Sequence, residues 1–225
     1  FNARFRHGAA FVEIVADDVS GGNGPDDLVE EIIDDKGKKV KVVKMSKSLG
    51  NFFTIREVFK LFTPESLRLL LLSTHYRGPI AYSPRLVEEA EKRVQSLYEA
   101  RRRMAKYLEK NPAEDGPSLE HVFSSPGKPF TPMKHFVDGM DDDFNTPEAI
   151  AALNEIVSVA NLLVDGREKE RTGQKLKPAT RACLLREATN IIDQMCTVLG
   201  VGLKDASTFL AEQRALRMRA KGIDE

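Results

Sequence analysis

Apolar residues recur every three or four positions through most of the chain after residue 54, and this spacing limits the possible folds more than any other feature. The pattern predicts helices over residues 64–74, 84–110, 146–165, 179–199 and 205–220. The helix at 146–165 carries two overlapping apolar rows, which give it the wide apolar face of a central bundle helix. We therefore predict a mainly α fold whose C-terminal part is an antiparallel helical bundle.

Several helix boundaries carry residues that satisfy free backbone groups. Thr54 and Glu57 have the spacing of a capping box, and Thr63-Pro64 places proline at the first position of the next helix. Gly200 follows the last apolar residue of the helix that starts at 179 and is expected to end it.

Before residue 54 the pattern changes to short β-like runs. Residues 9–15 and 38–43 are each predicted to be a strand, with a glycine-rich turn at 20–25 between them. The acidic stretch 26–34 is predicted to be a short helix. Residues 35–38 then turn the chain into the second strand, which completes a hairpin-like excursion.

The best internal boundary lies at residues 111–129, which hold four Pro, two Gly and three Ser. This composition predicts a linker, followed by a short helix at about 130–140. We expect four parts along the chain, namely residues 1–53, 54–110, 111–129 and 130–225.

The composition is that of an ordinary globular protein, with 225 residues, 41% of them apolar and 30% charged. No apolar run approaches the roughly 20 residues that span a bilayer, so no membrane partner is expected. Residues 1–6 include no signal-peptide stretch and no initiator Met, which predicts a portion of a longer, cytoplasmic protein. Cys183 and Cys196 lie among helical apolar residues and suggest no disulfide framework.

Charge is unevenly distributed although the net charge is zero. Residues 17–35 hold eight acidic residues and no basic one, whereas residues 167–186 hold seven basic residues and two acidic ones. Arg101-Arg102-Arg103 adds a basic triplet. Such runs are most often solvated helix faces, and the alternative is a surface that contacts a phosphate backbone.

A lysine-rich loop joins the strand at 38–43 to the helix start at Thr54. We call residues 44–48 (Lys44-Met45-Ser46-Lys47-Ser48) the lysine loop. Two ammonium groups beside hydroxyls and backbone amides are suited to a polyphosphate, as they supply both cations and neutral donors. A lysine-rich turn in solvent is the alternative for so short a stretch.

The sequence around the lysine loop resembles one enzyme family. Residues 44–82, including Leu49-Gly50-Asn51-Phe52-Phe53-Thr54-Ile55-Arg56 and His75-Tyr76-Arg77-Gly78-Pro79, are similar to bacterial cysteinyl-tRNA synthetase, a class I aminoacyl-tRNA synthetase. Residues 140–149 (Met140-Asp141-Asp142-Asp143-Phe144-Asn145-Thr146-Pro147-Glu148-Ala149) resemble the start of that family's helical bundle. The resemblance covers roughly residues 40–200 and holds two motifs in the family's order.

The resemblance implies ligation of cysteine to tRNA(Cys) through a cysteinyl-adenylate made with ATP. Lys47 and Lys44 would be the catalytic cations, and Met45, Ser46 and Ser48 would shape the ATP-phosphate loop with them. Residues 1–53 would be the end of a Rossmann-type catalytic domain, 54–110 a stem-contact region and 130–225 a tRNA-binding bundle. The enzyme is expected to be monomeric.

The chain also departs from the family pattern. Family members carry a phosphate-binding signature with paired histidines near their start, and this chain has no such sequence. They also select cysteine with zinc, but here His7, His75, His121 and His135 show no spacing of metal ligands. We therefore assign no metal ligand here and expect the zinc ligands of the full-length enzyme to lie outside this chain. The resemblance also implies a further anticodon-contacting region beyond residue 225.

Two motif features have simpler interpretations than catalysis. His75 follows a leucine-rich helix and is predicted to bond the free carbonyls at its C-terminus rather than to act as a base. The acidic cluster Asp141-Asp142-Asp143 could suggest a metal, but we predict favourable placement near the start of the next helix.

Three functional hypotheses follow. The first is a C-terminal part of a cysteine–tRNA ligase that is inactive alone. The second is a free-standing tRNA-binding module that retains a relic loop. The third is a related ligase that joins cysteine to an aminated sugar, which should not need the anticodon-side bundle that the motif at 140–149 predicts.

Overall fold

The computed structural model describes five stretches of the chain, and side chains are described for residues 54–78, 80 and 82–219. These stretches are residues 11–15, 29–33, 39–44, 54–78 and 80–220. The strands are β1 (Phe11–Val15), β2 (Val29–Ile33), β3 (Lys39–Lys44) and β4 (Ile80–Tyr82). The helices are α1 (Ile55–Val58), α2 (Pro64–Leu72), α3 (Pro84–Lys110), α4 (Leu119–Phe123), α5 (Pro132–Asp141), α6 (Thr146–Asp165), α7 (Lys169–Thr172), α8 (Pro178–Leu199) and α9 (Ala206–Ala220).

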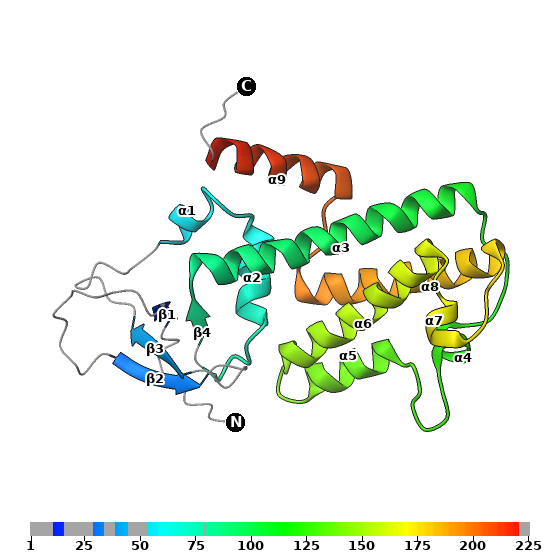
Figure 1. Ribbon diagram of the computed structural model, residues 1–225, viewed down its shortest axis with the longest axis horizontal. Helices are drawn as coiled ribbons and strands as arrows, with labels where there is room; N and C mark the ends of the chain where they lie inside the picture. The colour runs from blue at the N-terminus through cyan, green and yellow to red at the C-terminus, as the bar shows by residue number, and fades with distance from the viewer. Residues whose placement is uncertain (1–10, 16–28, 34–38, 45–53, 79, 221–225) are drawn as a thin grey trace.

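The described strands form one mixed sheet beside a larger helical part (Figure 1). The strand order is β2-β3-β1-β4, with β1 antiparallel to β3 and parallel to β4. β4 follows α2 in the chain, so the sheet joins strands from both sides of the lysine loop. The predicted strands at 9–15 and 38–43 are confirmed as β1 and β3.

The predicted acidic helix at 26–34 is wrong, because residues 29–33 form β2. β2 pairs antiparallel with β3, and Glu31 lies opposite Lys41 in the register. Val29, Ile32 and Ile33 are β-branched and favour the extended conformation. Pairing with a neighbouring strand therefore outweighs the weak helical pattern, and the predicted hairpin-like excursion is confirmed.

The predicted capping residues lie at the start of α1, at the start of α2 and at the end of α8. The Thr54 hydroxyl accepts from the Glu57 N–H at 3.2 Å, while the Glu57 carboxylate accepts from the Thr54 N–H at 2.7 Å. Pro64 begins α2, and Gly200, with a φ of 67°, ends α8 in the left-handed conformation.

The long helix α3 contributes to two hydrophobic clusters. Near its start, Val87 and Ala90 pack with residues of α1, α2 and β4 in the smaller cluster. Further along, Val94, Leu97 and Met104 join the larger cluster, which contains the helical bundle. The helix therefore connects the sheet side of the molecule to the bundle.

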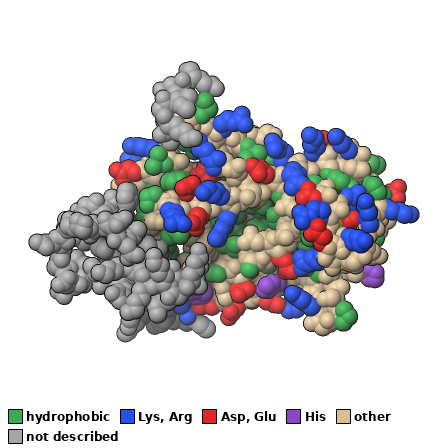
Figure 2. All heavy atoms as spheres, viewed as in Figure 1, with side chains coloured by type: hydrophobic (Ala, Val, Ile, Leu, Met, Phe, Trp, Pro, Cys, Tyr) green, Lys and Arg blue, Asp and Glu red, His purple; other side chains and the backbone are tan. Residues whose placement is uncertain are grey.

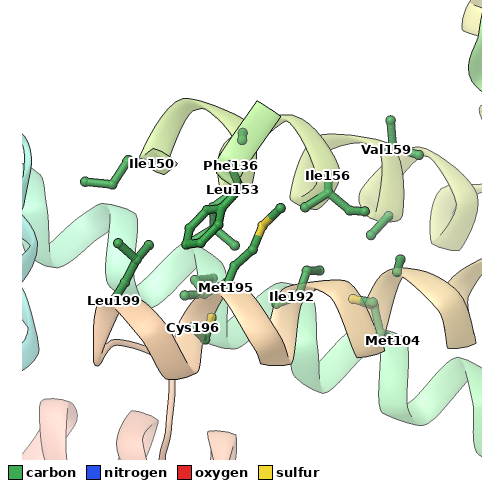
Figure 3. Packing of buried hydrophobic residues seen from close by; sticks show 14 of the residues in the cluster. Met104, Phe136, Ile150, Leu153, Ile156, Val159, Ile192, Met195, Cys196 and Leu199 are labelled. Carbon is green, nitrogen blue, oxygen red and sulfur yellow. The ribbon is translucent and has the colours of Figure 1, made fainter. Parts of the chain in front are cut away.

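The larger cluster forms around α6, as its two apolar rows predicted. α6 packs against α5, α8 and α3. Figure 3 shows side chains from α5, α6 and α8, among them Phe136, Leu153 and Met195, directed toward one another. By length and composition α6 is apolar enough to cross a membrane, but here it is the interior helix of the bundle.

The loop predicted over 111–129 is partly wrong, because α4 lies inside it. Leu119 and Phe123 of α4 are buried in the larger cluster, and Phe130 packs there as well. The Leu119 N–H donates to the Glu187 carboxylate of α8 at 2.8 Å. Proline and glycine mark the turns around α4, but two buried apolar residues fold the segment onto the bundle. The position of the domain boundary stays a prediction.

The last helix, α9, packs on α3 and is shown in Figure 1 on the side of α3 away from α6. The ring of Phe209 stacks on that of Tyr98, with centroids 4.0 Å apart. The Tyr98 hydroxyl donates to the Glu65 carboxylate at 2.8 Å and accepts from the Lys204 N–H at 3.0 Å. Glu65 also accepts from the Gly202 N–H at 2.7 Å. One carboxylate at the start of α2 therefore fixes both α3 and the α8–α9 connection.

A buried carboxylate also lies between α3 and α9. Glu91 is 3% exposed, and neither of its oxygens has a hydrogen-bond partner of good geometry within the described residues. Burial raises the pKa of the Glu91 carboxyl, and Gln213 and Arg217 of α9 oppose this shift only in part. The backbone of Thr63 and the carboxylate of Glu88 are the other groups that act on it.

We predict that Glu91→Gln stabilises the chain at pH 7 by about 1 kcal/mol, the scale of an unsatisfied buried polar group. In the unfolded chain the carboxyl ionises near the ordinary value of 4.5, whereas in the folded chain its pKa is raised. The wild type therefore loses stability as pH rises above that value. Urea unfolding of both proteins at several pH values measures the difference, which should shrink as pH falls toward 4.5.

The matched control is Glu88→Gln on the same helix. Glu88 is exposed, and its ion pair with Lys92 at 2.9 Å lowers its pKa, so this change should not stabilise the chain at pH 7. A Glu91→Gln difference that is independent of pH would contradict the buried charge.

Candidate functional site

The lysine loop begins at the end of β3. Lys44 is the last residue of β3, and its Cα pairs with that of Val12 on β1. Met45, Ser46, Lys47 and Ser48 lie outside the described residues, so their predicted phosphate contacts stay a prediction. Because β1 also pairs with β4, the strand that ends in Lys44 is separated from β4 by one strand.

The chain between α2 and β4 forms a turn that contains the second part of the first motif. The Gly78 N–H donates to the His75 carbonyl at 2.8 Å and closes the turn. The Arg77 N–H donates to Nδ1 of His75 at 3.3 Å. The rings of His75 and Tyr76 stack with centroids 4.9 Å apart, and the Arg77 guanidinium lies over the Tyr76 ring.

The predicted role of His75 as a C-terminal cap of α2 is wrong. α2 ends at Leu72, earlier than expected, and the Ser73 hydroxyl donates to the Leu69 carbonyl at 2.7 Å. His75 lies past this end, in the turn itself, where its ring nitrogen accepts a backbone hydrogen bond. Serine therefore satisfies the free carbonyl that the histidine was expected to bind.

Asp143, in the turn between α5 and α6, binds the α2–β4 turn. Its carboxylate accepts from the Tyr76 hydroxyl at 2.9 Å and from Nη2 of Arg77 at 3.2 Å. Nη1 of Arg77 forms an ion pair with the same carboxylate at 3.0 Å. Nε2 of His75 lies 3.9 Å from the same carboxylate. We call these contacts of Asp143 with Tyr76 and Arg77 the Asp143 link. The structure thus brings together the two motifs that the sequence singled out.

The backbone of the α5–α6 turn has an unusual conformation at the Asp143 link. Asp143 and Phe144 have φ angles of 53° and 55°, in the left-handed region. This conformation costs roughly 1–2 kcal/mol for a residue other than glycine. The Thr146 hydroxyl donates to the Leu72 carbonyl at 2.7 Å, so a second contact joins the start of α6 to the end of α2.

The predictions for the residues around this turn are therefore only partly right. Asn145 caps α6, because its Oδ1 accepts from the Glu148 N–H at 3.4 Å. The acidic cluster was expected to favour the start of α6, but the Asp143 carboxylate instead binds across to the α2–β4 turn. Asp142 is the C-terminal cap of α5.

Ion pairs neutralise part of the positive charge of the two basic stretches in the sequence. In the triplet, Arg101 pairs with Asp193 at 2.7 Å and Arg103 pairs with Asp165. Arg102 has no hydrogen bond or ion pair to any described residue. Figure 2 shows Lys and Arg side chains along the upper edge of this face, near α3 and α9, and Asp and Glu side chains gathered at its lower edge.

In the basic run at 167–186, too, some of the cations form ion pairs and others do not. Arg167 pairs with Glu170 at 2.8 Å, and Arg171 pairs with Glu155 at 2.8 Å. Within the described residues, its lysines make no ion pair. These are Lys169, Lys175 and Lys177. A solvated helix face and a phosphate-contacting surface are therefore both compatible with this run.

The described residues do not fit a zinc site. No group of three or more His, Cys, Asp or Glu side chains among them is arranged to hold a metal ion. Cys183 and Cys196 lie on α8 as free thiols. Burial raises the pKa of the Cys196 thiol to about 11, and the nearby Arg101 lowers it only in part. A buried, protonated thiol is a poor metal ligand, because the thiolate is the form that binds metals.

Comparison with known proteins places the two motifs in two domains. Residues 26–92 match a family model described as the tRNA synthetases class I (C) catalytic domain. Residues 135–204 match a DALR domain. A curated cysteine–tRNA ligase from Nitratidesulfovibrio vulgaris is 37% identical over 187 residues, which are 83% of this chain and 36% of the relative. The chain belongs to the cysteine–tRNA ligase family.

Other members of the cysteine–tRNA ligase family match over a similar region. The enzyme from Nitrosococcus oceani is 39% identical over 76% of this chain and 32% of its own length. The enzyme from Polynucleobacter necessarius is 39% identical over 81% of this chain and 35% of its own length. The chain therefore spans about a third of the length of the curated relatives it matches.

The sequence did not reveal that the two family motifs touch. Tyr76 and Asp143 are 67 residues apart, and no periodicity or spacing predicts a contact over that distance. The signal that was available is the residue chemistry, since one motif holds Arg77 and the other holds three adjacent carboxylates. Opposite charges in two motifs are only a weak guide to contact.

We predict that the Asp143 link contributes about 0.5–1 kcal/mol to the free energy of unfolding, the upper range for exposed ion pairs. The Asp143 side chain is 41% exposed and that of Arg77 is 69% exposed, so solvent screens the pair. A double-mutant cycle with Asp143→Gly and Arg77→Ala measures the coupling by urea unfolding. Glycine keeps the left-handed backbone while removing the carboxylate.

The control for this cycle is Asp141→Ala, paired with the same Arg77→Ala change. Asp141 belongs to the same acidic cluster but makes no ion pair with a described residue. Its cycle should show no coupling. Equal coupling energies for Asp143 and Asp141 would show that general electrostatics, rather than the Asp143 link, acts on Arg77.

Proposed function

We propose that the chain is part of a cysteine–tRNA ligase, which activates cysteine with ATP and transfers it to tRNA(Cys). The carboxylate of cysteine attacks the α-phosphate of ATP, and pyrophosphate leaves. Negative charge grows on the departing phosphates in the transition state. Cations placed at that charge lower the barrier, because they bind the transition state more tightly than the substrate.

The lysine loop supplies these cations in our proposal. Lys47 is the main contact with the ATP phosphates, and Lys44 adds a second charge at the end of β3. Met45, Ser46 and Ser48 shape the loop and provide hydroxyls and amides to the phosphates. What supports this assignment is the match of residues 26–92 to a class I catalytic domain.

The remaining parts contact the tRNA. Residues 1–53 represent the end of a Rossmann-type catalytic domain, and residues 54–110 form a stem-contact region. Residues 111–129 connect this region to the tRNA-binding bundle at 130–225. The Asp143 link and the Thr146–Leu72 hydrogen bond join the bundle to the helix that leads into β4. The enzyme acts as a cytoplasmic monomer on ATP, cysteine and tRNA(Cys).

The order of the two matched domains is the observation that carries the proposal. The relatives that span both are named cysteine–tRNA ligases. Neither a free-standing tRNA-binding module nor a ligase acting on an aminated sugar finds support in the comparisons. No step is assigned to zinc, since the described residues do not fit a zinc site.

We predict that residues 1–225 bind tRNA(Cys) without catalysing cysteine-dependent pyrophosphate exchange. Binding measured by filter retention should weaken steeply as salt rises from 50 to 200 mM, because phosphate contacts release counterions. The control is the same assay with a DNA duplex of equal charge. A pyrophosphate-exchange rate that is higher with cysteine than without it would contradict the predicted inactivity. Absent or salt-independent tRNA binding would contradict the proposed role of the bundle.

In the complete enzyme we predict that Lys47→Ala slows adenylate formation by about 2–4 kcal/mol of transition-state stabilisation, the scale of losing one preorganised contact. The affinity for cysteine should change little, since the loop contacts phosphates. Single-turnover kinetics separate the two quantities. Lys110→Ala, at the exposed end of α3, is the control. Unchanged chemistry with weakened cysteine binding would contradict the assignment.

A further inference from the structure

A recess of about 560 Å³ opens between α3, α8 and the start of α9. Its floor is apolar, with Met104 and Leu108 from α3 and Ile192 from α8. Met104 and Ile192 are buried in the larger hydrophobic cluster, and Leu108 packs against it. The floor is therefore a rigid part of the fold, and the recess above it is open to solvent.

The rim of the recess carries cations that the fold leaves unpaired. Arg102 and Lys106 are four residues apart on α3, so they lie on one face of the helix and both border the recess. Both are exposed, and neither makes a hydrogen bond or ion pair with a described residue. The neighbouring Arg101 and Arg103 are instead neutralised by aspartates.

Most acidic groups at the recess are already engaged. Asp193 pairs with Arg101, and the Asp205 carboxylate accepts from the Thr208 N–H at 2.9 Å. Glu109 is the lining carboxylate without such a partner in the described part of the chain. Lys204, a further lining cation, pairs with Glu212. The unpaired charge at the rim is therefore positive, with Arg102 and Lys106 against Glu109.

We propose that this recess binds one nucleoside phosphate, with the phosphate at Arg102 and Lys106 and the base on the apolar floor. Arg and Lys bind phosphate oxygens through charge-assisted hydrogen bonds, and a flat base that covers the floor buries apolar surface. The source is an unstacked nucleotide of RNA or a free nucleotide. The RNA source rests on the proposed function, in which the bundle contacts tRNA.

The surface around Tyr76 and Phe144 lacks these properties. The exposed aromatic rings of Tyr76 and Phe144 lie near Asp141, Asp142 and Asp143, where carboxylates would repel a phosphate backbone. In Figure 2, Asp and Glu side chains gather at the lower edge of the face shown, and Lys and Arg side chains lie along its upper edge. The recess combines cations with a concave apolar surface, and the surface around Tyr76 and Phe144 does not.

The experiment measures binding of fluorescein-labelled decaadenylate, AMP and tRNA(Cys) to residues 1–225 by fluorescence anisotropy and competition. Arg102→Ala with Lys106→Ala should weaken decaadenylate binding about tenfold, as two phosphate contacts are lost. Ala105→Trp, at an exposed lining position, fills the recess without changing charge. It should weaken binding at least about fivefold, because the base can no longer bury apolar surface on the floor. Thermal unfolding checks that each variant folds, and Ser207→Trp at the facing rim replaces Ala105→Trp if that variant does not.

The matched control is Arg85→Ala with Arg93→Ala, which removes two charges from α3 away from the recess. It should weaken binding less than about twofold, and this change measures the general effect of removing two positive charges. Recess variants that match this control, or tryptophan variants that bind like wild type, would overturn the inference. AMP competing as well as decaadenylate would identify a free nucleotide as the source, and weaker competition by AMP would identify RNA.

The same measurements separate this inference from the proposed function. If wild type binds tRNA(Cys) but the recess variants bind every probe like wild type, the recess is not a nucleotide-binding site and the proposed function stands. If the nucleotide probes bind through the recess but tRNA(Cys) does not bind, the proposed role of the bundle fails and the recess stands. Absence of binding by all three probes would overturn both.

Discussion

The structure depends on the packing of α3 into two hydrophobic clusters at once. Its first turns bury Val87 and Ala90 beside α2 and β4, and its later turns bury Val94 and Met104 in the bundle. Burial of apolar side chains on both sides stabilises each cluster and fixes their relative position. A helix in contact with only one cluster would leave the sheet and the bundle as separately packed units.

Specific polar contacts connect the same two parts of the molecule. The Asp143 link and the hydrogen bond from Thr146 to Leu72 tie the start of the bundle to the segment that enters β4. β4 lies beside β1, and β1 lies beside the strand that ends in Lys44. A continuous set of contacts therefore runs from the bundle, which we propose contacts tRNA, to the base of the lysine loop. The strained backbone at Asp143 is consistent with a turn held in place by these contacts.

The sequence predicted the elements better than their contacts. Capping residues and apolar spacing located α2, α3, α6 and α8 because these signals are local. The strand β2 was missed because its partner strand decides its conformation, and α4 was missed because burial of Leu119 and Phe123 outweighs a loop-like composition. The lysine loop could be proposed as a phosphate site from residue types alone. That Arg102 lacks an ion pair among the described residues could not be predicted. It depends on Arg101 and Arg103, rather than Arg102, lying close to aspartates from other helices.

The most direct test of the central claim, that α3 unites the two clusters, is native-state hydrogen exchange of residues 1–225 at increasing urea concentrations. Backbone amides in α2 around Leu70 and in α6 around Ile156 should open with the same free energy, because α3 cannot leave one cluster without disturbing the other. Opening of α2 at a clearly lower free energy, with α6 still protected, would show two independent units and contradict the claim.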